Sequence, residues 1–185
     1  MYFATISAPR LVSAVGALAL LAAPALAQTP ARTAAQSAAC QPVFAALDKV
    51  MSLPTHLYST LDPGEGKETR HIESIYAGGA IYQKEKGGWE KMKVTTIEAA
   101  NQERENRTKT KPSCEFIKEE NVDGKPANLY RVLTKTSTDT TSTQVWIART
   151  KGTLVKQEID IDGGNSGKMH YSVKYEYDNV EAPKL

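Results

Sequence analysis

The chain has 185 residues, with 24% charged and 41% hydrophobic residues and a formal charge of +2 at pH 7. No basic stripe or acidic tail stands out, so the composition excludes the electrostatic footprint of a nucleic-acid-binding protein. This length predicts one ordinary domain, which can bury a hydrophobic core without a structural metal.

Residues 1–27 have the pattern of a secretory signal peptide. Arg10 is the only charge, residues 11–23 form an apolar run, and residues 25–27 give a small-x-small cleavage pattern. The run is too short to cross about 30 Å of hydrocarbon. We therefore predict a periplasmic protein that does not span a membrane after cleavage. An uncleaved anchor and lipidation at Cys40, which lacks a full lipobox, are the alternatives.

The N-terminal part of the mature chain predicts a leader and one helix. Residues 28–39 are rich in Ala, Thr and Gln without periodicity, and we interpret them as a disordered leader before a single domain at 40–185. A helix is predicted at about 41–52, because Pro42 suits a first turn and Pro54 ends the pattern. Its apolar residues recur on one helical face: Val43, Phe44, Leu47, Val50 and Met51.

From residue 55 the apolar period becomes two, which indicates strands. A first strand at 55–61 is followed by three short ones, separated by glycine pairs at 78–79 and 87–88 that are typical of hairpin turns. Thr95 and Glu98 form a capping box, which predicts a second, solvated helix at about 96–106. Five more strands follow without an intervening helical pattern, at 114–122, 128–136, 142–150, 153–162 and 168–178.

These elements predict an α+β fold, in which a curved antiparallel sheet of about nine strands meanders beside a packed N-terminal helix. The last two strands have one charged face and one apolar face with tyrosines. The predicted apolar face comprises Val155, Gln157, Ile159, Ile161, Tyr171, Val173, Tyr175 and Tyr177. Because a twisted sheet of this size tends to curl, that face encloses either a filled core or a cavity.

No catalytic or metal-binding motif is found in the sequence. Residues 163–169 lack the spacing of a phosphate-binding loop, and residues 160–165 do not continue as a calcium loop. His56, His71 and His170 fall on three different predicted strands without short ligand spacing. We therefore expect no enzyme, no metal and no cofactor; convergence of the three histidines would be the one reason to revise this expectation.

The two cysteines, Cys40 and Cys114, lie at the borders of predicted elements. In an exported protein an even count is most simply one disulfide, which would hold the helix that begins at Pro42 against the strand that begins near Glu115. Two free thiols are the alternative. Neither cysteine, however, lies in a C-x-x-C motif or beside a histidine.

The chain resembles the LolA-like group of periplasmic proteins, which includes lipoprotein carriers and outer-membrane lipoprotein-sorting proteins. The resemblance rests on the helix followed by a meander, on "YRV" at 130–132, on "VWIARTKGTLVKQEIDI" at 145–161 and on "YEYDNV" at 175–180. It is best over 114–180 and weaker over 40–94. It implies a half-open β-barrel closed by helices, which holds acyl chains or another apolar ligand in its concave face.

The leading functional hypothesis is non-enzymatic binding of a lipid or other hydrophobic ligand on the concave face, linked to lipoprotein or outer-membrane lipid handling. The predicted lining residues are Phe44, Leu47, Tyr130, Trp146, Ile159, Ile161, Tyr171, Tyr175 and Tyr177. The alternative is a structural or regulatory periplasmic module with a fully packed core, which would bind a partner protein through an edge or a face of the sheet.

Overall fold

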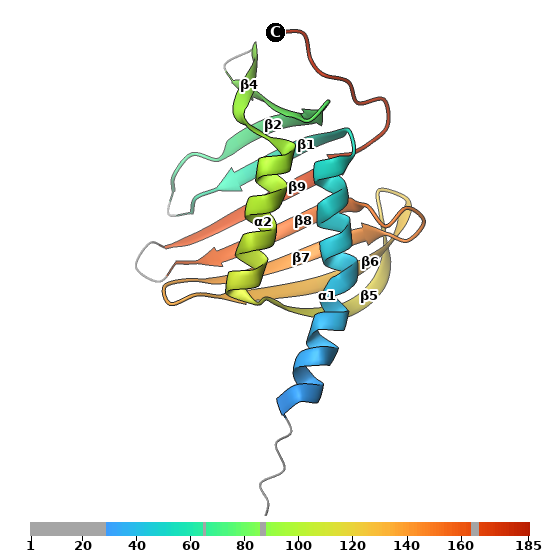
Figure 1. Cartoon of the computed structure of the whole chain (residues 1–185). Helices are drawn as coiled ribbons and strands as arrows, with labels where there is room; N and C mark the ends of the chain where they lie inside the picture. The colour runs from blue at the N-terminus through green and yellow to red at the C-terminus, as the bar shows by residue number, and fades with distance from the viewer. Residues whose placement is uncertain (1–28, 65, 86–87, 164–166) are drawn as a thin grey trace, which may run out of the picture.

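The computed structural model describes residues 29–64, 66–85, 88–163 and 167–185, with the side chains of the first helix described from residue 38 onward. The predicted signal peptide and Gly87 lie outside the described residues. Two helices and nine strands follow in chain order (Figure 1). Their bounds are α1 Thr29–Ser52, β1 Thr55–Asp62, β2 Arg70–Ala77, β3 Ala80–Glu85, β4 Gly88–Thr95, α2 Thr96–Thr110, β5 Ser113–Val122, β6 Lys125–Lys135, β7 Thr140–Ala148, β8 Leu154–Asp162 and β9 Lys168–Glu176.

All nine strands belong to one antiparallel sheet with the order β4-β3-β2-β1-β9-β8-β7-β6-β5. Two meanders, β1 to β4 and β5 to β9, are therefore joined where β1 pairs with β9. The strands β4 and β5 form the two edges of a curved, open sheet. The predicted α+β class and the predicted strands are confirmed. The pairing of β1 with β9 brings together segments that are far apart in the sequence.

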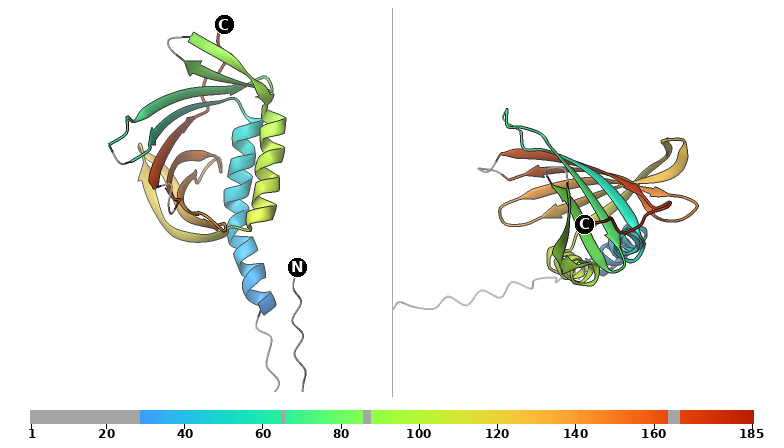
Figure 2. Two further views of the ribbon diagram at one scale, coloured as in Figure 1. Left: turned by 90° about the vertical axis from the view of Figure 1, so that its left-hand side faces the viewer. Right: turned by 90° about the horizontal axis from the view of Figure 1, so that it is seen from above.

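Both helices lie on the concave side of the sheet (Figure 2). The helix α2 follows β4 directly and leads into β5, so it connects the two edges across the open side. Its N-terminus has the predicted capping box: the Thr95 hydroxyl accepts from the Glu98 amide, and the Glu98 carboxylate accepts from the Thr95 amide. It ends at a left-handed residue, Lys111, just before Pro112. This arrangement is the half-open barrel closed by helices that the family resemblance implied.

The helix α1 differs from its prediction because it begins at Thr29 rather than near residue 41. The segment Thr29–Ala39, interpreted as part of a disordered leader, is helical, and Pro42 lies inside the helix rather than in its first turn. This segment has no apolar periodicity to reveal a helix, but it is rich in alanine, the strongest helix former. Extending an existing helix costs far less than nucleating one, so the packed part can propagate toward the N-terminus.

The main core lies between α1 and the concave face. Val43, Ala46 and Val50 of α1 pack in one cluster with buried residues of the sheet, among them Leu57, Val145, Leu154 and Val173. Leu154 is fully buried. The spacing of the α1 residues predicted this face correctly.

A second, smaller core lies on the convex side, where Trp146 packs with Ala127, Leu129 and Val155. The prediction that Val155 shares the concave face with Gln157 is therefore wrong. The reason is a register shift between β7 and β8 at Trp146 and Ile147. A bulge of this kind adds a residue to one strand and breaks the alternation of its side chains between the two faces.

Candidate functional site

A cavity of about 480 Å³ lies between the two helices and the concave face of the sheet. Its volume falls in the range typical of small-molecule sites. Three surfaces line it: an apolar wall from α1, a polar wall from α2, and a floor from the strands. The lining residues are Val43, Phe44, Leu47, Val50, Met51, Leu57, Tyr76, Glu103, Asn106, Arg107, Thr110, Pro112, Val132, Thr134, Thr141, Thr143, Val145, Gln157, Ile159 and Tyr175.

The α1 wall follows from helical geometry, because residues three and four apart share a face. Val43, Phe44, Leu47, Val50 and Met51 all line the cavity. Val43 and Val50 are buried in the core cluster, whereas Phe44 and Leu47 remain half-buried beside it. The same apolar face therefore stabilises the fold and presents hydrophobic surface to the cavity.

The α2 wall carries charge next to this apolar surface. The Arg107 guanidinium donates to Asp48 of α1 at 2.8 Å and lies 4.8 Å from the centre of the Phe44 ring. Its Nε lies 3.7 Å from Glu103, and Arg104 also pairs with Asp48 at 3.5 Å. Burial raises the pKa of Glu103; Arg107 opposes this shift and Asp48 adds to it. The cavity thus has a paired cation and carboxyl group on one side and hydrocarbon on the other.

Tyrosines gather on the concave face, and Tyr175 among them is buried. The Tyr175 hydroxyl donates to the Gln157 side-chain oxygen, and both residues are buried and line the cavity. Burial raises the pKa of Tyr175 well above its ordinary value, with further contributions from Tyr177, Tyr76 and Tyr171. The hydrogen bond satisfies two polar groups in an apolar setting, which is the condition for keeping them there.

We expect Tyr175→Phe to lower the free energy of unfolding by about 1–3 kcal/mol, because the Gln157 oxygen would lose its donor while buried. Replacing both partners with apolar groups removes this penalty, so Tyr175→Phe combined with Gln157→Leu should recover most of the loss. Urea unfolding of the two single variants and the double variant measures the coupling. If the losses in free energy of unfolding of the two single variants simply add in the double variant, the hydrogen bond between Tyr175 and Gln157 is not their cause.

The structure brings four of the nine predicted lining residues into the cavity: Phe44, Leu47, Ile159 and Tyr175. Three others, Tyr130, Tyr171 and Tyr177, pack against the main core cluster but do not line the cavity. Ile161 lies further along β8 and lines a separate hollow beside Met169 and His170.

Trp146 does not lie on the concave face, and its predicted place in the lining is wrong. Its neighbour in the chain, Val145, lines the cavity, and successive side chains of a strand point to opposite faces. The Trp146 indole instead donates to Glu120 at 2.6 Å on the convex side.

Sequence reasoning missed the polar part of the lining. Glu103, Asn106, Arg107 and Thr110 belong to a helix that has almost no apolar stripe and was predicted to be solvated. The signal for the floor was weak: threonine is frequent in the segment 134–143, and Thr134, Thr141 and Thr143 line the cavity.

The three histidines are not brought together. His56 contacts Glu73 at 2.9 Å, His71 contacts Thr60 at 3.2 Å, and His170 contacts Asp160 at 2.8 Å. Within the described part of the chain, no group of three or more His, Cys, Asp or Glu residues is arranged to hold a metal ion. None of the described helices is long and apolar enough to cross a membrane.

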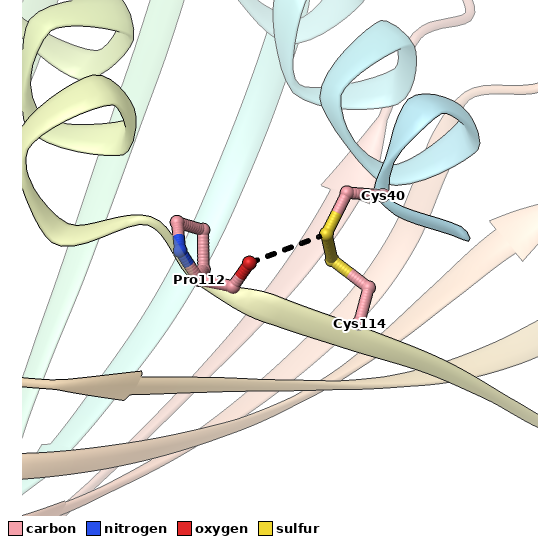
Figure 3. The surroundings of a disulfide bond; sticks show 3 residues. All are labelled: Cys40, Pro112 and Cys114. Atoms are coloured by element: carbon pink, nitrogen blue, oxygen red, sulfur yellow. Dashed lines mark hydrogen bonds between the residues drawn. A yellow bond between two sulfur atoms is a disulfide. The ribbon is translucent and has the colours of Figure 1, made fainter. Parts of the chain in front are cut away.

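The predicted disulfide between Cys40 and Cys114 is confirmed (Figure 3). Their Cα atoms are 5.0 Å apart and both residues are buried. The Cys40 sulfur lies 3.6 Å from the carbonyl oxygen of Pro112, in the short link between α2 and β5. The bond therefore holds α1 at the point where α2 joins the sheet, beside the cavity.

Comparisons of the sequence with protein-family models and with curated proteins give no match. Among solved structures, LprF from Mycobacterium bovis aligns with a TM-score of 0.46 and 11% identity, over 80% of this chain and 95% of that one. MucB aligns with a TM-score of 0.49 and 10% identity, over 80% of this chain and 61% of that one. An outer membrane lipoprotein-sorting protein domain from Vibrio parahaemolyticus aligns with a TM-score of 0.25 and 8% identity, over 76% and 93%.

Proposed function

We propose that this protein binds a lipid or another hydrophobic ligand, without catalysis, in the cavity between its helices and the concave face of its sheet. The observation that carries the proposal is the cavity of about 480 Å³ against the apolar face of α1. Small-molecule sites are typically clefts of about 300–1,000 Å³ with a mostly apolar lining, so a cleft of this size against an apolar helix face supports ligand binding.

The lining favours an amphiphile over a purely apolar ligand. Phe44, Leu47 and Ile159 offer surface to a hydrocarbon chain, while Arg107 and Glu103 stand at the α2 side. Ligand sites commonly combine a mostly apolar lining with a few polar groups that fix orientation. A hydrocarbon chain against α1 and the floor, with its polar end toward α2, matches this distribution.

We propose that the protein acts in the periplasm and takes part in lipoprotein or outer-membrane lipid handling. This part of the proposal rests on the signal-like residues 1–27 and on the disulfide, since disulfides persist in oxidising compartments.

Ligand binding is tested with protein purified from its native periplasm, by native mass spectrometry and lipid extraction, followed by titration with a fluorescent fatty acid. We expect Thr143→Phe to weaken binding of this probe by at least about tenfold, or about 1.4 kcal/mol, because the ring would fill the cavity floor. Phenylalanine is well tolerated in strands, so the sheet should remain intact.

The matched control is Gln144→Phe, which places the same ring at the next position of β7, where the side chain is exposed and outside the cavity. It should leave the affinity for the probe unchanged. Protein that is always empty and ignores the probe, or equal affinities for the two variants, would refute the proposal.

The free edge of β5 supports a second candidate function, the docking of a partner protein. Phe116 and Ile117 on this edge strand are 48% and 39% exposed, so the edge carries apolar side chains at the surface. An extended segment of a partner could add to this edge as a further strand. Empty protein that does not bind the probe would favour this function.

A further inference from the structure

The convex face of the sheet carries a row of aromatic and basic side chains that the proposed ligand site does not use. In the pairing of β7, β8, β9 and β1, Trp146 lies opposite Lys156, Lys156 opposite Lys174, and Lys174 opposite Tyr58. Residues that are directly opposite in neighbouring strands have Cβ atoms only about 5 Å apart. These four side chains therefore form a continuous band across four strands.

A hollow of about 720 Å³ lies over this band. The strands form its floor, while the end of β5 and the turn that follows it form a wall. The lining residues are Tyr58, Thr60, Glu120, Asn121, Val122, Asp123, Trp146, Val155, Lys156, Ser172, Val173 and Lys174. The wall stands over the band because Asp123, in the turn between β5 and β6, reaches Lys174 with an N–O distance of 3.4 Å.

Two facing lysines on a sheet are unfavourable, since like charges directly opposite one another repel. Here both are held in place. Lys156 Nζ lies 5.0 Å from the centre of the Trp146 ring and 2.8 Å from Glu158. Lys174 forms longer ion pairs, to Asp123 at 3.4 Å and to Glu176 at 3.5 Å. Such a pair of cations is suited to a shared anion.

Glu120 and Asp123, the two carboxylates of the wall, differ in their contacts. Glu120 accepts from the Trp146 indole at 2.6 Å and pairs with Lys118 at 2.8 Å, and these contacts with Lys118 and Trp146 lower its pKa. Its charge is thus already compensated. Asp123 lies in an exposed turn, and its hydrogen bond raises the pKa of Lys174. Asp123 occupies the position that an external anion would take beside Lys174.

We propose that this hollow is a second binding site, which takes a phosphate group between Lys156 and Lys174 and displaces the Asp123 carboxylate. A phosphate brings more charge than one carboxylate and can accept from both ammonium groups at once. Tyr58, Ser172 and Asn121 line the same hollow and add hydroxyl and amide donors. The phosphate can belong to a soluble phosphate ester or to a phospholipid headgroup. This site is on the face opposite the cavity and does not depend on ligand binding there.

The Trp146 indole N–H is a direct probe of the hollow, and the chain has only 2 tryptophans, which Trp89→Phe reduces to one. In ¹H–¹⁵N NMR spectra we expect inorganic phosphate to shift the Trp146 indole signal saturably, and chloride at equal ionic strength not to. Lys174→Gln should weaken phosphate binding by about tenfold or more, as for the loss of a charge-assisted contact. Asp123→Asn should strengthen it several-fold, because one of the two carboxylates that pair with Lys174 would lose its charge.

Lys151 and Asp178 provide the matched control, since they form an exposed ion pair at 3.5 Å outside the hollow. Lys151→Gln and Asp178→Asn should leave phosphate binding unchanged. The substitutions at Asp123, Lys174, Lys151 and Asp178 all change exposed side chains, and thermal unfolding verifies that each variant is folded.

A second experiment distinguishes a soluble phosphate ester from a phospholipid headgroup. It measures binding of the protein to phosphatidylglycerol vesicles and to phosphatidylcholine vesicles. Binding of inorganic phosphate supports a soluble ester, and binding only to phosphatidylglycerol vesicles, lost in Lys174→Gln, supports a lipid headgroup. No saturable response in either arm, or an undiminished response in Lys174→Gln, overturns the proposal. Binding of an acidic peptide alone would also overturn it and would instead indicate a protein partner.

Discussion

Replacing Cys40 with Ser is expected to lower the free energy of unfolding by about 2–5 kcal/mol, the usual loss when a small secreted domain loses a native bridge. The bond closes a loop between residues that are 74 positions apart, which by chain entropy alone is worth about 4 kcal/mol. It also joins α1 to the start of β5, so its loss should loosen α1 over the cavity first. Urea unfolding of the variant and of reduced wild-type protein measures the effect.

The double variant, with Ser at positions 40 and 114, is the control, because it removes the bond without leaving a free thiol. It should match the single variant and the reduced protein in stability. Thiol titration of the unfolded, unreduced wild-type protein should detect no reactive thiol. Two reactive thiols per chain, or equal stabilities with and without reductant, would show that the bridge does not stabilise α1.

Above about pH 10 we expect stability to fall by up to about 4 kcal/mol per pH unit. Burial raises the pKa values of Tyr76, Tyr175 and Tyr177 in the folded protein. The unfolded chain ionises its tyrosines near pH 10, so each of these groups stabilises the fold fully below that pH. As the pH rises toward the pKa values of the folded protein, each tyrosine lowers the free energy of unfolding by about 1.4 kcal/mol per pH unit.

Urea unfolding between pH 8 and 12, on samples exposed only briefly to alkali, gives this slope. Tyr175→Phe should reduce it by about 1.4 kcal/mol per pH unit, although the variant is less stable at neutral pH. The comparison with wild-type protein cancels the titration of lysines, which both proteins share. An identical slope in the two proteins would show that Tyr175 ionises as readily in the folded chain as in the unfolded one.

Much of the fold could be predicted because its signals are local. The alternation of Tyr171, Val173 and Tyr175 defines one face of a strand, and the glycine pair at 78–79 provides the positive φ values of a hairpin turn. The capping box of Thr95 and Glu98 marks the start of α2 within one helical turn. The disulfide was predictable as well, because the chain has exactly two cysteines and a signal-like N-terminus.

The sequence by itself thus determined the fold class, most of the strands, the apolar face of α1 and the disulfide, since neighbouring residues specify these features. Only the tertiary structure decided the pairing of β1 with β9, the crossing of α2 over the open side and the cavity beneath it. It also placed Val155 on the convex face through one bulge, and it brought Arg107 over Phe44. These features depend on contacts between distant segments and on a single register shift, and neither leaves a periodic pattern in the sequence.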